Sequence, residues 1–271
     1  MARVLITRSA DGLGRAAAQN LLDDGHEVVV HARSNARLAA VRDLVDLGAA
    51  AVVGDLSDLD DTRGVAEQVN RLGQMHAVIH NAGVDTGRSI RSVNVVAPYL
   101  LTVLLHRPSR LVYLSSSMHR GGRTDVTCIE HSGRGTSCSY SDSKLLVTTL
   151  AMAVARLWPT VLSNAVDPGW VPTRMGGPGA SDDLRLGHIT QVWLATSDDP
   201  EARSTGGYWH HQRLHNPDPS VHDLRFQDEL LAALAQVTGS PLKSTVAAAD
   251  RPAAGGGAPV RGPTVTRRSP R

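Results

Sequence analysis

The stretch VLITRSADGLG, residues 4–14, joins an apolar, β-branched run to a glycine-containing turn and then to residues with helical spacing. Val4 to Thr7 predicts a strand, and Leu13 to Leu22 predicts a helix. A turn between a strand and a helix directs backbone N–H groups and the positive end of the helix dipole at one point. The stretch therefore predicts an α/β unit with a phosphate-binding turn.

The alternation of strand and helix continues beyond this unit. Short β-branched runs predict strands at 27–31, 51–54, 77–80, 110–114 and 161–166, and amphipathic runs predict helices at 36–47, 62–72, 94–105 and 141–157. Val28–Val30 is continuously apolar, as expected for a strand covered on both faces. The order predicts an α/β fold with a doubly wound, Rossmann-type parallel sheet. Helices at 183–196 and 223–236 and a strand near 208–211 are expected to complete it.

Length and composition predict one domain followed by a tail. The chain has 271 residues, which suffices for a single α/β core, and 41% of them are hydrophobic. Residues 239–271 are dominated by Ala, Gly, Pro and Arg and contain six Lys or Arg and one Asp. Such a segment cannot build a core, so we expect a domain at 1–238 and a disordered tail at 239–271. The rest of the chain is mildly acidic, which argues against a nucleic-acid partner.

The cysteines, histidines and apolar runs restrict the class of protein further. Cys128 and Cys138 match no zinc or redox motif and are predicted to be free thiols of a reducing compartment. His211 and His215 have no carboxylate or cysteine partner nearby in the sequence, so no metal site is predicted. The N-terminus lacks the apolar stretch of a signal peptide, and no apolar run reaches the roughly 20 residues of a membrane span. These features favour a cytoplasmic protein.

The segment from Tyr140 to Lys144, YSDSK, carries the clearest chemistry. The phenol and the ammonium stand at i and i+4, on one face of a predicted helix. A free tyrosine titrates near pH ~10, and a nearby ammonium stabilises the phenolate and lowers that pKa. Tyr140 is therefore a candidate acid/base for proton exchange with a substrate oxygen. A surface tyrosine packed on a lysine stem is the alternative that this spacing leaves open.

Several motifs in one order resemble the short-chain dehydrogenase/reductase family over about residues 3–210. The turn at 7–14 resembles the family's TGxxxGxG loop, HNAG at 80–83 resembles its NNAG motif, and DPGWVPT at 167–173 resembles its PG…T segment. The YSDSK segment follows the fifth strand, as in the family. The resemblance implies a nicotinamide dinucleotide held by Thr7, Arg8, Ser9, Asp11, Gly12, Leu13, Gly14, Arg33, Asp55, Leu56, Asn81, Ala82, Gly83, Tyr140, Lys144, Pro168, Gly169, Val171 and Thr173.

The same resemblance implies a catalytic set of Asn94, Ser116, Tyr140 and Lys144. Ser116 would bind the substrate oxygen, with Ser117 as the competing assignment, and Asn94 would hold a water relay to the lysine. A buried asparagine that bonds a kinked helix is the alternative at position 94. The long spacing from Ser116 to Tyr140, with His119 after the serines, is similar to the retinol-dehydrogenase-like branch.

Arg8 departs from the family pattern, which has its first glycine at this position. If the position needs a positive φ or a close backbone approach, arginine is strained there. One hypothesis is that Arg8 reaches a phosphate of the cofactor. The alternative is a tolerated substitution that points to solvent.

The end of the second strand, His31-Ala32-Arg33, indicates which dinucleotide is preferred. An acidic residue there accepts hydrogen bonds from the adenosine ribose and selects NAD, but Ala32 occupies that position. Arg33 can pair with a 2′-phosphate through charge-assisted hydrogen bonds. NADP(H) is therefore favoured over NAD(H), unless Arg33 simply solvates the start of a helix.

These observations predict an NADP(H)-dependent enzyme that interconverts a carbonyl and an alcohol on a small organic substrate. Ser116 and Tyr140 would bind the substrate oxygen, and Tyr140 would supply the proton. Reduction of an activated C=C bond is a variant that the residues do not distinguish. The alternative from another class is a non-catalytic dinucleotide sensor or scaffold, which rests on Arg8 and the Arg-rich tail. Monomer and homodimer both remain open.

Overall fold

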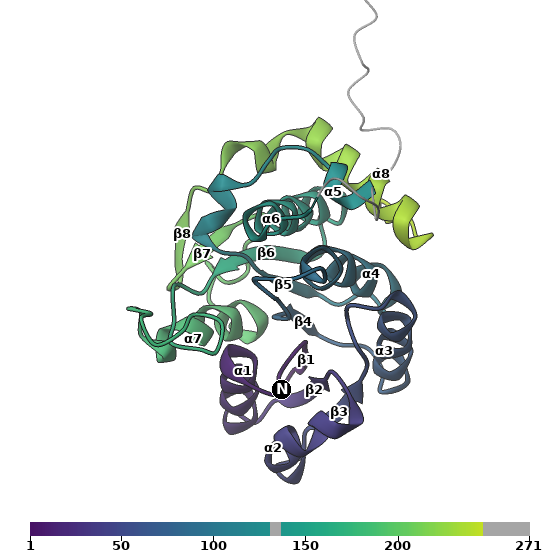
Figure 1. The fold of residues 1–271 in the computed structure, drawn as a ribbon. Helices are drawn as coiled ribbons and strands as arrows, with labels where there is room; N and C mark the ends of the chain where they lie inside the picture. The colour runs from purple at the N-terminus through teal and green to yellow at the C-terminus, as the bar shows by residue number, and fades with distance from the viewer. Residues whose placement is uncertain (131–136, 246–271) are drawn as a thin grey trace, which may run out of the picture.

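The computed structural model describes residues 1–130 and 137–245, which form an eight-stranded sheet between two layers of helices (Figure 1). The strand order is β3-β2-β1-β4-β5-β6-β7-β8. Neighbouring strands are parallel from β3 to β7, and β8 is antiparallel to β7. The strands are β1 (Arg3–Ile6), β2 (Glu27–Ala32), β3 (Ala50–Val53), β4 (Ala77–His80), β5 (Arg110–Leu114), β6 (Leu162–Asp167), β7 (Tyr208–His210) and β8 (Arg213–His215). The doubly wound Rossmann-type sheet is confirmed.

The helices cover both faces of the sheet and enclose two apolar clusters. One cluster joins the sheet to α1 (Gly12–Asp23) and α7 (Leu184–Thr196). The other joins it to α3 (Leu59–Arg71), α4 (Ala97–Leu104) and α6 (Tyr140–Leu157). Further out, α8 (Leu224–Thr238) packs against α6, and α5 (Thr127–Glu130) packs against α8 (Figure 1). Both faces of the central strands are therefore buried, as their continuous apolar runs require.

The topology gathers the predicted site residues at one edge of the sheet. The register pairs Ile6 with Ile79, His80 with Tyr113 and Leu114 with Val166. The strands β1, β4, β5 and β6 are parallel, so the residues that follow them meet at their shared carboxyl ends. The strand order reverses between β1 and β4, and ligands of open α/β sheets bind at such a switch point.

One predicted helix, at 36–47, is not a continuous α-helix, because its first half is a 3₁₀ segment. The structure has a 3₁₀ segment at Asn35–Val41 and only the short α2 (Arg42–Asp46). The guanidinium of Arg15 donates to the carbonyl of Ala40 at 2.9 Å and pairs with Asp43. This contact takes up a carbonyl that a continuous α-helix would use internally.

The boundary at 238 is also wrong for the first residues of the tail. Tyr99 donates its hydroxyl proton to the carbonyl of Ser240 at 2.8 Å, and the Trp158 indole donates to the carbonyl of Lys243 at 2.7 Å. Thr245 donates its backbone N–H to Leu157. Residues 240–245 are therefore bonded to the domain, because two side chains far away in the sequence supply donors. The predicted tail at 246–271 lies outside the described residues.

Within 1–130 and 137–245, no helix combines the length and apolarity that a membrane crossing requires.

Candidate active site

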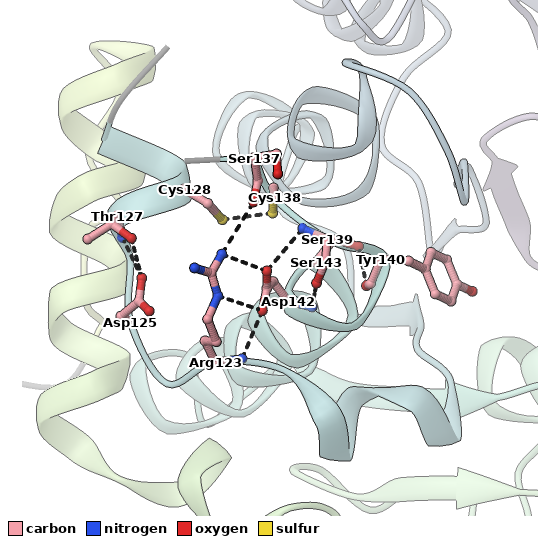
Figure 2. Close-up of polar contacts among 10 residues, drawn as sticks. All are labelled: Arg123, Asp125, Thr127, Cys128, Ser137, Cys138, Ser139, Tyr140, Asp142 and Ser143. Atoms are coloured by element: carbon pink, nitrogen blue, oxygen red, sulfur yellow. Dashed lines mark hydrogen bonds and ion pairs between the residues drawn. The ribbon is translucent and has the colours of Figure 1, made fainter. Parts of the chain in front are cut away.

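The helix α6 begins with a set of polar contacts that fixes the position of Tyr140 (Figure 2). Ser139 is its N-cap and exchanges hydrogen bonds with Asp142, which forms a capping box. Arg123 donates to the Asp142 carboxylate from its backbone N–H at 2.9 Å and from its guanidinium at 2.9 Å. Burial disfavours the charged form of Asp142, but the contacts from Arg123 and Ser139 outweigh burial and lower its pKa to about 2. The first turn of α6 is therefore held at a carboxylate between Tyr140 and Lys144.

The structure brings Ser116, rather than Ser117, to Tyr140. The Ser116 side chain is partly buried and acts on the Tyr140 hydroxyl in the direction that lowers its pKa, whereas Ser117 is exposed. The neighbouring Ser115 is buried against the hydroxyl of Thr148 at 2.6 Å. Ser116 and Tyr140 thus present two hydroxyl groups to one point, where a substrate oxygen could bind.

The expected direction of the pKa shift at Tyr140 is wrong, because in this structure the pKa is raised and not lowered. Burial raises the pKa of Tyr140 to about 12, although the hydrogen bond from Ser116 opposes this effect. The ammonium of Lys144 lies 5.4 Å from the centroid of the Tyr140 ring and donates to the carbonyl of Leu114 at 2.7 Å. Burial also lowers the pKa of Lys144 to about 8, because an ammonium loses its hydration there. The arrangement keeps the phenol protonated and suits it to donate a proton.

Asn94 sits in a π-helical turn, Ser92–Val96, that runs directly into α4. Its amide accepts from the N–H of Val84 at 2.8 Å and donates to the carbonyl of Val84 and to the Ser143 hydroxyl, both at 2.9 Å. A Cβ on Gly83 would lie 3.6 Å from the Lys144 ammonium and 3.7 Å from Asn94 Oδ1. Asn94 therefore ties the loop after β4 to α6, and both interpretations of its role stay predictions.

The phosphate turn fits a dinucleotide at the N-terminus of α1. Gly12 has φ of +55°, and Asp11, the N-cap, makes no side-chain capping bond. A Cβ on Gly14 would lie 2.4 Å from Asn81 Nδ2 and 2.5 Å from the Arg8 carbonyl oxygen, so only glycine allows this close approach. The turn and the helix dipole therefore form a cradle suited to a pyrophosphate.

Arg8 is strained as expected, with φ of +53°. Its guanidinium donates to the carbonyl of Gly83, and its Nε lies 3.7 Å from Asp11 Oδ1. The side chain spans the groove between the ends of β1 and β4, so the solvent-pointing alternative is wrong. Whether Arg8 contacts a cofactor phosphate stays a prediction.

His31 anchors the Arg8 backbone, a role that the sequence did not indicate. Arg8 donates its N–H to His31 Nδ1 at 3.0 Å, so His31 Nε2, which is 2.9 Å from the carbonyl oxygen of Gly54, carries the ring proton. Burial lowers the pKa of His31, so it is neutral. The Ser9 hydroxyl accepts from the His31 N–H at 2.7 Å, and Thr7 accepts from the N–H of Ala82 at 2.9 Å. The hydroxyls of Thr7 and Ser9, predicted cofactor contacts, are thus turned inward and hold the turn in place.

Two cavities flank Arg8 along the groove. The first, of about 370 Å³, is lined by Tyr140 and Lys144 together with Leu13, Asn81, Pro168 and Thr173. The second, of about 710 Å³, contains Arg33, Asp55, Leu56 and Ala82. The two cavities suit the nicotinamide end and the adenosine end of a bound dinucleotide, respectively. Val171 is buried and Gly169 has φ of +82°, so these two shape the turn after β6.

Asp11 stands among three arginines at the junction of the two cavities, which the sequence analysis missed. Its carboxylate oxygens lie 3.7 Å from Arg8, 3.3 Å from Arg37 and 3.6 Å from Arg174. In the second cavity Arg33 is 76% exposed and pairs with Asp55 at 2.8 Å. The groove therefore carries an excess of cationic groups, which suits it to phosphates.

His119 and the residues around it hold the backbone of Ser116 in place. His119 is fully buried, and its Nδ1 lies 2.7 Å from the carbonyl oxygen of Ser116. Its Nε2 accepts from the N–H of Asp218 at 2.9 Å, so Nδ1 is the protonated nitrogen and donates to Ser116. The ring lies 4.8 Å from that of Tyr208, whose hydroxyl donates to Asp167 at 3.0 Å. The sequence placed His119 near the site but gave no sign of this contact.

Comparison with known proteins agrees with this geometry. Residues 2–110 match the model of the short chain dehydrogenase family. The short-chain dehydrogenase chyC of Penicillium rubens is 35% identical over 256 residues, covering 89% of this chain and 99% of that protein. DnrU of Streptomyces sp., assigned by name as a daunorubicin C-13 ketoreductase, is 31% identical over 265 residues, covering 87% of this chain and 92% of that protein. The chain is therefore an oxidoreductase, and it belongs to the short-chain dehydrogenase family.

Solved structures share the fold at lower identity. A blue fluorescent protein from a metagenomic library, solved in complex with NADPH, superposes with a TM-score of 0.63 at 21% identity, covering 77% of this chain and 95% of that chain. At this identity the likeness shows the fold alone. Assignment to the retinol-dehydrogenase-like branch stays a prediction.

Proposed function

We propose that this protein is an NADP(H)-dependent reductase of ketones that interconverts a carbonyl and an alcohol. The observation that carries the proposal is the position of Tyr140 and Lys144 in one cavity, next to a dinucleotide cradle, with the Ser116 side chain acting on Tyr140. The cationic second cavity supports a cofactor with an additional phosphate, and the blue fluorescent protein of the same fold was solved with NADPH.

Four residues in and beside the first cavity divide the work of the reaction. When bound, NADPH supplies a hydride. The hydroxyls of Ser116 and Tyr140 hold the carbonyl oxygen, which fixes its orientation and stabilises the negative charge that develops on it. Tyr140, protonated because it is buried, donates its proton to that oxygen. Lys144 places a positive charge beside the phenol that has lost its proton, and Asn94 links Val84 to the catalytic helix.

The names of the relatives support a proposal for the substrate class. DnrU carries a name that assigns it a ketone at C-13 of daunorubicin, and chyC is a short-chain dehydrogenase. Leu184 and Met175 line this cavity together with Pro172, so part of its wall is apolar. We therefore propose a ketone on an apolar organic molecule, and daunorubicin is a suitable first probe.

A fluorescence titration of the bound nicotinamide tests the choice of cofactor. We expect NADPH to bind more tightly than NADH, and Arg33→Ala to weaken NADPH by about 10- to 100-fold, because charge-assisted hydrogen bonds contribute about 1.5–3 kcal/mol. NADH affinity should stay within about twofold. Arg42→Ala, at an exposed position outside both cavities, is the control. Equal affinities for the two cofactors in the unmodified protein, or an Arg33→Ala variant that binds NADPH normally, would contradict the proposal.

A non-catalytic dinucleotide sensor is the second candidate, and the strained Arg8 across the groove is the observation that favours it. A sensor binds NADPH but reduces no ketone. Absence of turnover across a panel of ketones, in protein that binds NADPH tightly, would place this reading first.

A further inference from the structure

Two thiols lie beside the start of the catalytic helix, away from both cavities (Figure 2). Cys128 belongs to α5, and Cys138 directly precedes Ser139, the N-cap of α6. Their sulfur atoms are 2.7 Å apart. Cys128 is 2% exposed, whereas Cys138 is partly exposed, so a small reagent can reach the pair from one side. The reaction proposed above uses neither thiol.

The fold holds both cysteines in place from separate directions. Cys128 is fixed through α5, which packs against α8. Cys138 lies between Ser137, whose carbonyl accepts from Arg123 at 3.3 Å, and the capping residue Ser139. A disulfide has a sulfur–sulfur distance of about 2.05 Å, so bond formation requires the two sulfurs to approach by less than about 1 Å. The contact is thus set by tertiary structure, since ten positions separate the residues in the chain.

The hydrogen bond between the two thiols favours the thiolate form at one sulfur. The hydrogen bond between the thiols lowers the pKa of Cys128 and raises that of Cys138. The Arg123 guanidinium adds to the lowering at Cys128, while burial, Asp142 and Asp125 oppose it. The thiolate is the form that reacts with oxidants. A thiol that reacts as the thiolate and touches a second thiol is the arrangement in which a sulfenic acid is captured as a disulfide.

We propose that Cys128 and Cys138 form a modification site, at which a hydroperoxide produces a reversible disulfide across the start of α6. The Cys128 thiolate attacks one oxygen of hydrogen peroxide, the O–O bond breaks, and the released hydroxide takes up a proton to become water. Cys138 then attacks the sulfur of the resulting sulfenic acid, its S–H proton leaves with the displaced hydroxide as a second water, and the S–S bond forms. The two thiols together lose two electrons and two protons, and the peroxide is reduced to two waters. An added dithiol reverses the bond by exchange.

The bond has a consequence for catalysis, and this part rests on the proposed function. Closing the two sulfurs draws Cys138 towards α5 and away from the cap formed by Ser139 and Asp142. Tyr140 follows that cap directly, and small displacements of a catalytic group are costly to the rate. We expect kcat to fall about tenfold in the oxidised protein. The affinity for NADPH should stay within about twofold, because both cavities lie elsewhere.

The test uses the reduced full-length protein and one equivalent of hydrogen peroxide. Trypsin cleaves after Arg123, Arg134 and Lys144, so the two cysteines fall on separate peptides, 124–134 and 135–144. The proposal predicts that these peptides are joined under non-reducing conditions and separate with dithiothreitol. It also predicts that titratable thiols fall from two to none in a monomeric chain. Unjoined peptides, sulfinic acid on either peptide, or a bond between two chains would overturn it.

Single substitutions separate the site from the reaction. Cys138 is partly exposed, so the Cys138→Ser variant should fold. It should keep the basal activity and lose both the cross-link and the sensitivity to peroxide. Cys128→Ser is the matched variant, because it removes the other sulfur of the pair. A disulfide that forms while kcat is unchanged overturns the coupling to Tyr140. A disulfide in a protein that reduces no ketone refutes the proposed function and leaves the modification site standing.

Discussion

The ammonium of Lys144 lies 5.4 Å from the centroid of the Tyr140 ring and donates to the carbonyl of Leu114 at 2.7 Å. Burial raises the pKa of Tyr140 to about 12 and lowers that of Lys144 to about 8. The phenol therefore keeps its proton across the neutral range. Lys144 is the member of the pair that changes charge near neutrality.

This relationship predicts the pH dependence of ketone reduction. Below about pH 8, Lys144 is charged and Tyr140 is protonated, so kcat/KM should be constant from pH 6 to about 7. Above about pH 8 the ammonium loses its proton, and kcat/KM should fall about tenfold per pH unit. Initial rates at saturating NADPH and constant ionic strength measure this. A profile that rises with pH up to 10 contradicts the assigned protonation states, and Lys144→Met should lack the transition.

Ser116 and Ser117 offer a matched pair of substitutions. The Ser116 side chain is partly buried and acts on the Tyr140 hydroxyl, whereas Ser117 is exposed. Removing one donor to a developing oxyanion costs roughly 10²–10³ in kcat. Ser116→Ala should show a loss of this size, and Ser117→Ala should stay within about threefold of the unmodified enzyme. Steady-state rates with one ketone are sufficient, and a larger loss at Ser117 would reverse the assignment.

Asp11→Asn should strengthen cofactor binding. The Asp11 carboxylate engages Arg8, Arg37 and Arg174 at the point where the cofactor phosphates are expected. Neutralising it frees those cations, and three partly exposed pairs at about 0.2–1 kcal/mol each total about 0.6–3 kcal/mol, so Kd should fall at least about threefold. NADPH and NADH should gain alike.

The control for Asp11 is Asp43→Asn, which breaks the pair with Arg15 outside the two cavities. Isothermal titration at two salt concentrations measures both variants, and the gain at Asp11 should shrink as salt screens the charges. Weaker cofactor binding by Asp11→Asn would show that the carboxylate contributes to the cradle instead.

Asp142→Asn should destabilise the fold through the start of α6. The folded-state pKa of Asp142, about 2, lies below the ordinary value near ~3.9, so its contribution is fully present above about pH 4 and is lost as the pH falls towards 2. We expect the free energy of unfolding to drop by about 1–2 kcal/mol at pH 7. Urea unfolding at several pH values should show the difference from the unmodified protein shrink below pH 4. Asp60→Asn, at the exposed start of α3, should have a much smaller effect, and a difference independent of pH would argue against the ion pair with Arg123.

Residues 240–245 should contribute to stability although they follow the last helix. A chain ending at Gly239 loses the contacts of Tyr99 and Trp158, whereas a chain ending at Thr245 keeps them. Two hydrogen bonds at about 1 kcal/mol each predict a Tm lower by roughly 4–8 °C for the shorter chain. Scanning calorimetry of both truncated chains isolates these six residues, and equal Tm values would contradict the contacts.

The sequence predicted the features that depend on neighbouring residues. The strands β4 and β5 match their predicted bounds, because continuous apolar β-branched runs report burial on both faces. The strain at Arg8 was also foreseeable, because the turn requires a left-handed conformation at that position.

Features that depend on distant residues were not predictable in this way. The guanidinium of Arg15 interrupts the helix after β2, and Tyr99 holds the segment after α8. The pKa of Tyr140 depends on its burial, which the spacing to Lys144 does not report. The contact between the two cysteines likewise arises only when α5 and the start of α6 come together.

The most direct test is the NADPH-dependent reduction of a ketone by the unmodified protein and by Tyr140→Phe, measured side by side. Daunorubicin and simple aromatic ketones form the panel, and the best substrate of the unmodified protein is used for both. The account predicts that kcat/KM falls about 10²- to 10⁴-fold in the variant, while the Kd for NADPH stays within about twofold. A variant that reduces the same ketone at nearly the unmodified rate would contradict the role of Tyr140 as the proton donor.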